Sequence, residues 1–326
     1  MKFVIVGRGI LGSSLYHMLR RQGHDVTVIE SGERRIFPSL IHSLLLKGKD
    51  VDLAKESLKF YRELNVPMRE LPSITLGDIR DEIIRQWLSE GVEIKESYIP
   101  WLGAEGLVAK GGDRLVYVSR LISSVDYVRG KAKVDLERGK VYVDDKEVKA
   151  DKYIITAGPW NPCMLKVKSK SYYCWATLAF TRIRELGRYF VYDYEKGFYS
   201  RPLMGLGTGV VIVGDGKAVE SPPGTRMTVN REEVLEKVRE RLGELKPIYT
   251  AGEFCEGTPD MRPSYGEVIE GIYYAGGLDG YGAEVGPGVA KLLIKYIVSG
   301  EIERDYFLDR FSQVEEFSIG REPHEI

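Results

Sequence analysis

The first thirty residues constrain this chain more than any other stretch, because they follow the pattern strand, glycine-rich turn, helix, strand. An apolar run over residues 2–6 leads into Gly7, Gly9 and Gly12, which give the spacing G-x-G-x-x-G. Residues 13–22 carry apolar side chains at helical intervals. A second strand is predicted just before Glu30. The pattern predicts a βαβ unit that binds a dinucleotide.

Each residue of this motif has a mechanical reason. The first glycine makes the tight turn, the second lets a pyrophosphate approach the backbone, and the third lets the helix pack closely on the strand. The phosphates would meet the positive end of the helix. Glu30 would accept hydrogen bonds from a ribose hydroxyl, and its negative charge disfavours a 2′-phosphate. FAD or NAD is therefore favoured over NADP.

Composition excludes several other classes of protein. The chain has 326 residues, enough for two domains, and its formal net charge of -1 gives no electrostatic reason to bind nucleic acid or an anionic membrane. No apolar run is long enough to span a bilayer, and the chain begins directly with a strand, so we expect a cytoplasmic protein. The three cysteines are scattered, which predicts no metal site.

The middle and the end of the chain differ from its beginning. Between residues 167 and 216, strand-like runs rich in aromatic residues follow one another without helices, which predicts an antiparallel sheet. An apolar strand over residues 151–158 ends in small residues. The stretch 248–282 is rich in glycine, and Gly286-Pro287-Gly288 is predicted to open a helix over about 285–298.

Three separated stretches now resemble one family. The N-terminal βαβ unit, the strand DKYIITAGPW and the stretch MRPSYGEVIEGIYYAGGLDGYGAEVGPGVAKLL are similar to FAD-dependent oxidoreductases of the D-amino-acid oxidase, glycine oxidase and sarcosine oxidase group. The resemblance implies an α/β plus α+β fold, with a discontinuous Rossmann-like FAD-binding domain and an inserted, mainly antiparallel β-sheet substrate domain. It places residues 1–70, 107–165 and 255–326 in the FAD-binding domain, and 71–106 and 166–254 in the substrate-binding domain.

The resemblance also implies roles for individual residues. The cofactor-binding residues would be Gly7, Gly9, Gly12, Glu30, Val134, Ala157, Gly158, Gly277, Gly280, Tyr281 and Gly282. Arg262, in the Arg-Pro pair, would hold the substrate carboxylate, and Tyr199 would add a second contact. The alternatives are a structural ion pair for Arg262 and core packing for Tyr199. For Arg201 a salt bridge within the sheet is the favoured prediction, and a second cation near the site is the alternative.

Some positions depart from the family pattern. The segment 36–46 lacks the glycine that is common there, and Ser264 and Tyr265 stand where covalent-flavin members carry a cysteine, so FAD is expected to be non-covalent. The turn Leu278-Asp279 replaces the histidine or small residues of relatives.

The implied reaction is oxidation of a C–N bond of an amino acid or secondary amine to an imine, with two electrons passing to FAD. Oxygen, a quinone or a carrier protein would accept them, and an oligomer is compatible with the sequence. Three alternatives stay open. They are an FAD subunit of a multi-subunit dye-linked dehydrogenase, an FAD-dependent 2-hydroxy-acid dehydrogenase, and an NAD-dependent dehydrogenase.

Overall fold

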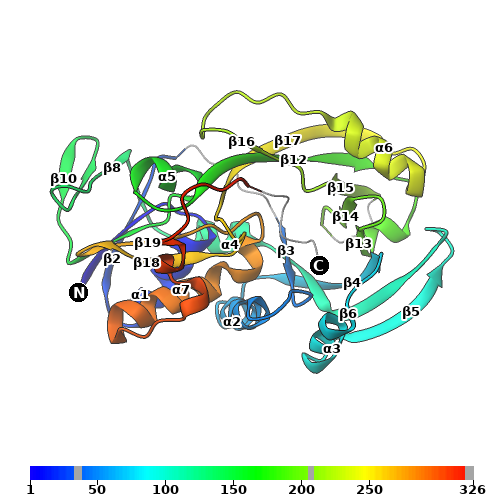
Figure 1. Ribbon diagram of the computed structural model, residues 1–326, viewed down its shortest axis with the longest axis horizontal. Coiled ribbons are helices and arrows are strands. Elements are labelled where there is room, and N and C mark those ends of the chain that lie inside the picture. The colour runs from blue at the N-terminus through cyan, green and yellow to red at the C-terminus, as the bar shows by residue number, and fades with distance from the viewer. Residues whose placement is uncertain (33–38, 205–208, 320–326) are drawn as a thin grey trace.

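One half of the molecule, on the left in Figure 1, is built on a mainly parallel sheet whose strands come from the beginning, middle and end of the chain. The computed structural model describes residues 1–32, 39–204 and 209–319, so residues 36–38 of the atypical segment 36–46 lie outside it. The sheet has the strand order β18-β19-β11-β1-β2-β7. Its strands are β1 Lys2–Val6, β2 Asp25–Glu30, β7 Val128–Arg129, β11 Lys152–Ile155, β18 Ser264–Ile269 and β19 Ile272–Gly276. Only the edge pair β18–β19 is antiparallel. The predicted βαβ unit is confirmed, because β1 pairs in parallel with β2 through α1 Ile10–Arg21.

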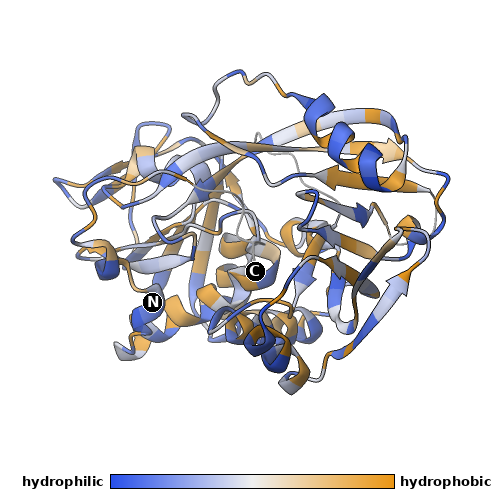
Figure 2. Ribbon diagram, turned by 45° about the vertical axis from the view of Figure 1, so that its right-hand side comes forward, coloured by the Kyte–Doolittle hydropathy of each residue, from blue (hydrophilic) through white to orange (hydrophobic). Residues whose placement is uncertain are grey.

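Helix α7, Gly282–Ser299, is the central helix of this half. Its buried side chains join those of α1 and of the parallel sheet in one hydrophobic core, and Figure 2 shows it mainly in the hydrophobic colour. The prediction that Gly286-Pro287-Gly288 opens this helix is wrong. The helix begins at Gly282, and Pro287 lies inside it. A Cβ at Gly288 would lie 2.6 Å from the carbonyl oxygen of Leu53, so the residue must be small for α7 to pack on α2, Asp50–Glu63.

A larger sheet forms the second half, with the order β16-β12-β15-β14-β13-β4-β6-β3, to which β17 adds beside β12 and β5 beside β6. Its strands are β3 Leu40–Ser43, β4 Met68–Leu76, β5 Glu93–Ile99, β6 Ala104–Val116, β12 Lys170–Phe180, β13 Phe190–Asp193, β14 Phe198–Pro202, β15 Val210–Gly214, β16 Ala218–Glu220 and β17 Lys246–Gly257. All its pairs are antiparallel except β13–β4. The mainly antiparallel second sheet is thus as predicted. The exact domain limits stay predictions, and β6 runs across the predicted limit at 106/107.

Smaller elements complete the described chain. A three-stranded meander contains β8 Ala132–Asp135, β9 Lys140–Val143 and β10 Lys146–Val148. The other helices are α2 Asp50–Glu63, α3 Asp81–Ser89, α4 Val118–Ser123, α5 Asn161–Met164 and α6 Arg231–Leu242. The 3-10 turns are Gly158–Trp160, Glu185–Gly187, Arg304–Tyr306 and Leu308–Phe311. None of the helices in the described ranges combines the length and the apolar character that a membrane span requires.

The two faces of the larger sheet have different chemistry. One face is apolar and packs on α6, through a core that includes Val191, Phe198 and Val238. Figure 2 shows the exposed side of α6 as mainly hydrophilic. Because side chains alternate along a strand, Tyr192 and Tyr199, which oppose each other on β13 and β14, lie on the other face. We call this second face the polar face, and it carries the residues considered next.

Candidate functional site

The glycine-rich turn after β1 is packed too tightly for side chains. Gly7 has φ +101°, and a Cβ there would lie 2.4 Å from the carbonyl oxygen of Thr156. A Cβ on Gly12 would lie 2.0 Å from the carbonyl oxygen of Gly7. Gly9 caps α1 without any side-chain hydrogen bond, so the first turn of α1 keeps backbone N–H groups for a ligand. These glycines fit the close approach of a pyrophosphate.

Glu30 lies at the end of β2, where the motif requires an acidic residue. Its carboxylate accepts hydrogen bonds from the backbone N–H of Arg8 at 2.9 Å and from the Ser31 hydroxyl at 3.1 Å. The backbone beside Glu30 is that of β7, and Gly130 donates to the Glu30 carbonyl at 3.0 Å. Val134 lies elsewhere, in β8 opposite Val141. A contact between Val134 and an adenine therefore stays a prediction.

A buried carboxylate joins the two turns that were predicted to line the cofactor. The backbone N–H of Ala157 donates to Asn161 Oδ1 at 2.8 Å, and Asn161 Nδ2 donates to Glu256 Oε2 at 2.7 Å. The N–H of Gly277 donates to the same oxygen at 3.0 Å. The turn at Ala157 and the turn at Gly277, far apart in sequence, are therefore held by one side chain from β17.

The second oxygen of this carboxylate is equally engaged. Glu256 Oε1 accepts hydrogen bonds from the Ser169 hydroxyl at 2.6 Å and from the Tyr274 hydroxyl at 2.9 Å. Burial raises the pKa of Glu256, and these four hydrogen bonds oppose the rise. Glu256 belongs to no recognisable sequence motif, so this residue was missed. The one signal in the sequence was that Glu256 is an acidic residue close to the predicted glycine-rich site.

The turn between β19 and α7 was predicted to approach the isoalloxazine. Gly277 and Gly280 have φ of +64° and +86°, and Asp279 between them has φ +44°, which is rare outside glycine. Asp279 is fully buried, and burial, together with the neighbouring Glu256, raises the pKa of its carboxyl well above the ordinary value. Tyr281 is buried and immediately precedes the first residue of α7, Gly282. The N-terminus of α7 thus directs its positive dipole toward this turn.

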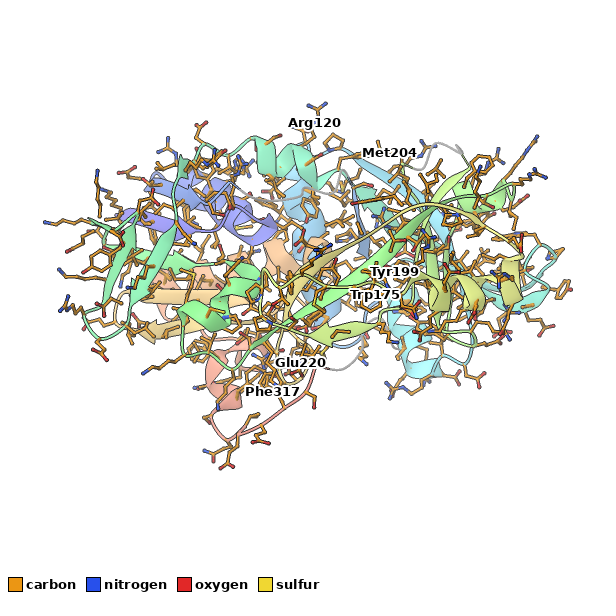
Figure 3. All side chains as sticks on the ribbon, turned by 90° about the horizontal axis from the view of Figure 1, so that it is seen from above. Arg120, Trp175, Tyr199, Met204, Glu220 and Phe317 are labelled. Carbon is orange, nitrogen blue, oxygen red and sulfur yellow. The ribbon has the colours of Figure 1, made fainter. Side chains whose placement is uncertain are left out.

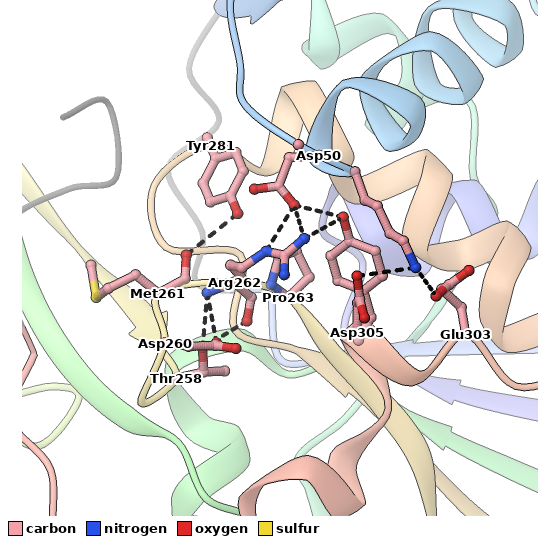
Figure 4. Close-up of polar contacts among 12 residues, drawn as sticks. Asp50, Thr258, Asp260, Met261, Arg262, Pro263, Tyr281, Glu303 and Asp305 are labelled. Atoms are coloured by element: carbon pink, nitrogen blue, oxygen red, sulfur yellow. Dashed lines mark hydrogen bonds and ion pairs between the residues drawn. The ribbon is translucent and has the colours of Figure 1, made fainter. Parts of the chain in front are cut away.

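Arg262 forms an ion pair within the protein (Figure 4). Its Nε and Nη2 donate to Asp50 Oδ1 at 3.1 and 3.0 Å, and Nη2 also donates to the Tyr306 hydroxyl at 3.0 Å. Tyr306 in turn donates to Asp50 at 2.6 Å. Burial works against the charge of Arg262, but Asp50 and Tyr306 outweigh it and raise the pKa of the guanidinium. The structural ion pair that was the alternative prediction for Arg262 is therefore present. Nη1 makes no hydrogen bond to the described residues.

The polar face of the larger sheet carries Tyr199, and Tyr192 opposite it. The ring of Tyr199 lies against the backbone of Gly214, where a Cβ would be 2.5 Å from the hydroxyl oxygen. Figure 3 labels Tyr199 and, further along the same segment, Met204, whose carbonyl accepts a hydrogen bond from the Tyr117 hydroxyl at 3.2 Å. Burial raises the pKa of Tyr192 well above its ordinary value, and the Asp113 and Glu284 carboxylates add to the rise. Helix α7, whose first turn holds Glu284, contacts β3 of this sheet, so the polar face lies near the start of α7.

Arg201 was predicted to form a salt bridge within the sheet, and this prediction is wrong for the described residues. No described carboxylate lies within salt-bridge distance of its guanidinium. It is 5% exposed. Its Nη2 donates to the Ser39 carbonyl at 3.1 Å, while Nη1 has only long contacts of 3.5 Å to the Ser39 hydroxyl and the Pro202 carbonyl.

Comparisons with known proteins agree with this geometry. The family model described as DAO, FAD dependent oxidoreductase, matches residues 2–296. An uncharacterized oxidoreductase of Bacillus subtilis (strain 168), YurR, is 23% identical over 365 residues, which cover 93% of this chain and 96% of that protein.

Solved structures with a similar fold include three enzymes. L-proline dehydrogenase from P. horikoshii has a TM-score of 0.80 and 20% identity, over 96% of this chain and 98% of that chain. Iminodiacetate oxidase from Chelativorans sp. BNC1 has a TM-score of 0.75 and 20% identity, over 92% and 96%. Glycine oxidase from Geobacillus kaustophilus has a TM-score of 0.74 and 17% identity, over 97% and 99%. At these identities the similarity concerns the fold.

Proposed function

Because this chain belongs to the DAO family of FAD-dependent oxidoreductases, we propose that it oxidises a C–N bond of an amino acid or secondary amine. The structurally similar enzymes include a dehydrogenase of L-proline and oxidases of glycine and iminodiacetate. The observation that carries the proposal is the position of the polar face. Tyr192 and Tyr199 line it, and Glu284 places it close to the start of α7. A substrate between them would lie against the turn at Gly277–Gly282.

FAD accepts two electrons from the substrate when it is bound. In this proposal Gly7, Gly9 and Gly12 hold its pyrophosphate and Glu30 its ribose, without a covalent bond. Ala157 and Gly158 would close on the pyrophosphate, and the residues from Gly277 to Gly282 would border the ring. The dipole at the start of α7 would favour negative charge at that point.

Tyr199 and Arg262 are the residues proposed to bind the substrate carboxylate. Tyr199 is only partly buried, and its ring lies on the polar face. Arg262 can offer its Nη1, because Nε and Nη2 are engaged with Asp50 and Tyr306. Arg262→Ala then raises KM for a carboxylate substrate by orders of magnitude while FAD stays bound. An unchanged KM would remove Arg262 from the substrate site.

The proposal leaves the electron acceptor open between oxygen, a quinone and a carrier protein. A cytoplasmic location also stays a prediction.

The test has two steps. Purified protein, supplied with FAD, is first examined for the absorption spectrum of a bound flavin. It is then mixed anaerobically with D- and L-amino acids, N-methyl amines, proline and 2-hydroxy acids, and bleaching of the flavin is recorded. Bleaching by amino acids or amines supports the proposal, and bleaching by hydroxy acids alone would contradict it. Protein that binds no FAD would refute the oxidation of amines and that of hydroxy acids alike.

A further inference from the structure

The guanidinium of Arg201 is buried without a neutralising partner among the described residues. The side chain leaves β14 in the interior of the larger sheet, two residues after Tyr199. Burial lowers the pKa of the Arg201 guanidinium, and the nearby hydroxyls of Tyr199 and Tyr192 only partly oppose this effect. The position is therefore a cation held in a site of low polarity.

Such a charge is unfavourable unless something compensates it. Transfer of an ionised group from water into the protein interior has a large unfavourable free energy, unless a counter-charge or a full set of hydrogen bonds replaces the water. Arg201 has one hydrogen bond of ordinary length, to the Ser39 carbonyl at 3.1 Å. A guanidinium has five N–H donors, so most of its capacity is available for an acceptor.

The direction of Arg201 links it to the substrate site. Side chains two residues apart on a strand share a face, so Arg201 lies on the polar face beside Tyr199. Arg262 differs, because two of its three nitrogens already contact Asp50 or Tyr306. The buried cation on the polar face that lacks a carboxylate partner in the described chain is thus Arg201.

We propose that Arg201 is a second cation that binds the substrate carboxylate, beside the Tyr199 hydroxyl and together with Arg262. This inference rests on the proposed function and narrows its substrate class. The substrate is an amino acid or N-substituted amino acid with a free carboxylate, because a carboxylate accepts two parallel hydrogen bonds from one guanidinium. Amines without a carboxylate leave Arg201 uncompensated and are poor substrates.

The test uses the FAD-loaded protein and three variants, Arg201→Met, Arg201→Lys and Arg262→Met. Binding of acetate and propionate is measured by perturbation of the flavin spectrum and by the shift in thermal unfolding temperature, with acetamide as the neutral control. We expect Arg201→Met to weaken carboxylate binding by about 100-fold or more, as expected for the loss of two charged hydrogen bonds. Arg201→Lys retains the positive charge but cannot donate two parallel hydrogen bonds, so it should weaken carboxylate binding by a smaller factor.

Stability provides a second readout. Replacing a buried charge that has no carboxylate partner among the described residues by methionine should leave the unfolding temperature of the ligand-free protein unchanged or higher. Arg262→Met breaks the pair with Asp50 and should lower it. If Arg201→Met does not fold, Arg201→Lys still tests the proposal through the difference between carboxylates and acetamide.

The outcomes separate the two proposals. Wild-type affinity for carboxylates in folded Arg201→Met would overturn the role of Arg201, whatever the enzyme oxidises. Equal turnover of amines with and without a carboxylate would overturn it as well. Failure of every amine and amino acid to bleach the flavin would overturn the proposed reaction, but acetate binding would still report on Arg201.

Discussion

The hydroxyl of Tyr61 donates a 2.8 Å hydrogen bond to the carbonyl oxygen of Ala283, in the first turn of α7. In an uninterrupted helix that carbonyl would accept the N–H of residue 287, but Pro287 has none. Tyr61, from α2, therefore supplies the donor that the proline removes. The relationship explains how α7 continues through a proline next to the candidate site.

Tyr61→Phe should destabilise the protein by about 1–3 kcal/mol, because a buried carbonyl loses its donor. In the background of Pro287→Ala the cost should shrink, since residue 287 then regains an N–H for Ala283. A double-mutant cycle by chemical denaturation measures this coupling. The exposed Tyr98 serves as the control for loss of a hydroxyl. Equal costs of Tyr61→Phe in both backgrounds would contradict the explanation.

Gly12→Ala should abolish FAD binding or weaken it by orders of magnitude. Its Cβ would lie 2.0 Å from the Gly7 carbonyl oxygen, so the turn must open. Titration with FAD, followed by flavin fluorescence, measures the effect. Gly91→Ala is the control, because this glycine follows the end of α3 and has no atom within 4 Å of its Cβ position. It has φ +82°, so a small loss of stability is expected there without any loss of FAD affinity.

Glu256→Gln and Glu256→Ala should behave differently. Glutamine can keep its oxygen toward Asn161 and Gly277, while its amide donates to the Ser169 and Tyr274 hydroxyls, which can also accept. This variant should fold and bind FAD, and the midpoint potential of the flavin should rise because a negative charge has been removed nearby. Alanine leaves four buried donors unsatisfied, at about 1–3 kcal/mol each, and should prevent stable folding. A potential unchanged in Glu256→Gln would argue that the charge does not reach the flavin.

Arg262→Ala should also lower stability, because the buried Asp50 keeps only the Tyr306 hydroxyl as a partner. We expect about 1–3 kcal/mol by chemical denaturation. Asp50→Asn should recover part of this loss in the double variant, since it removes the unpaired charge. Additive effects of the two substitutions would show that the ion pair contributes nothing.

Asp113 should make stability depend on pH. Its carboxyl is buried on β6 near the hydroxyls of Ser43 and Ser73, and burial raises its pKa from 3.8 to about 6. Because the pKa is higher in the folded state, the stability it contributes is complete below about pH 4 and is lost as the pH rises through 6. Asp113→Asn should therefore be more stable than wild type at pH 7.5, by an amount on the order of 2–3 kcal/mol, and not at pH 4. Unfolding temperatures of both proteins across this pH range measure the difference in stability. Wild type should be more stable than Asp113→Asn at no pH in this range.

The features that could be predicted from sequence are local. The βαβ unit and the change to an antiparallel sheet each follow from the spacing of residues within one stretch. The start of α7 could not be predicted, because a proline favours the first turn unless another element supplies the missing donor. That donor, Tyr61, is 222 residues away in sequence.

The candidate site shows the same division. The glycines of both turns are recognisable because backbone conformation demands them. The partners of charged side chains cannot be recognised from sequence, since they depend on tertiary packing. Arg262 meets Asp50 across 212 residues, and Arg201 meets no described carboxylate although it lies within a sheet. Glu256 belongs to no motif, yet it joins residues from positions 157 to 277 through Asn161 and Gly277.

The four hydrogen bonds to Glu256 impose an order on how the protein matures. Its partners Asn161 and Ser169 precede the long excursion from β12 to β17, whereas Tyr274 and Gly277 follow it. During synthesis, Asn161 and Ser169 can bond to Glu256 only after the segment from β12 to β17 has been synthesised and has folded. If the proposed residues hold FAD, we expect the cofactor to bind only after the C-terminal strands have emerged, because the N-terminal motif alone would supply only part of the proposed site.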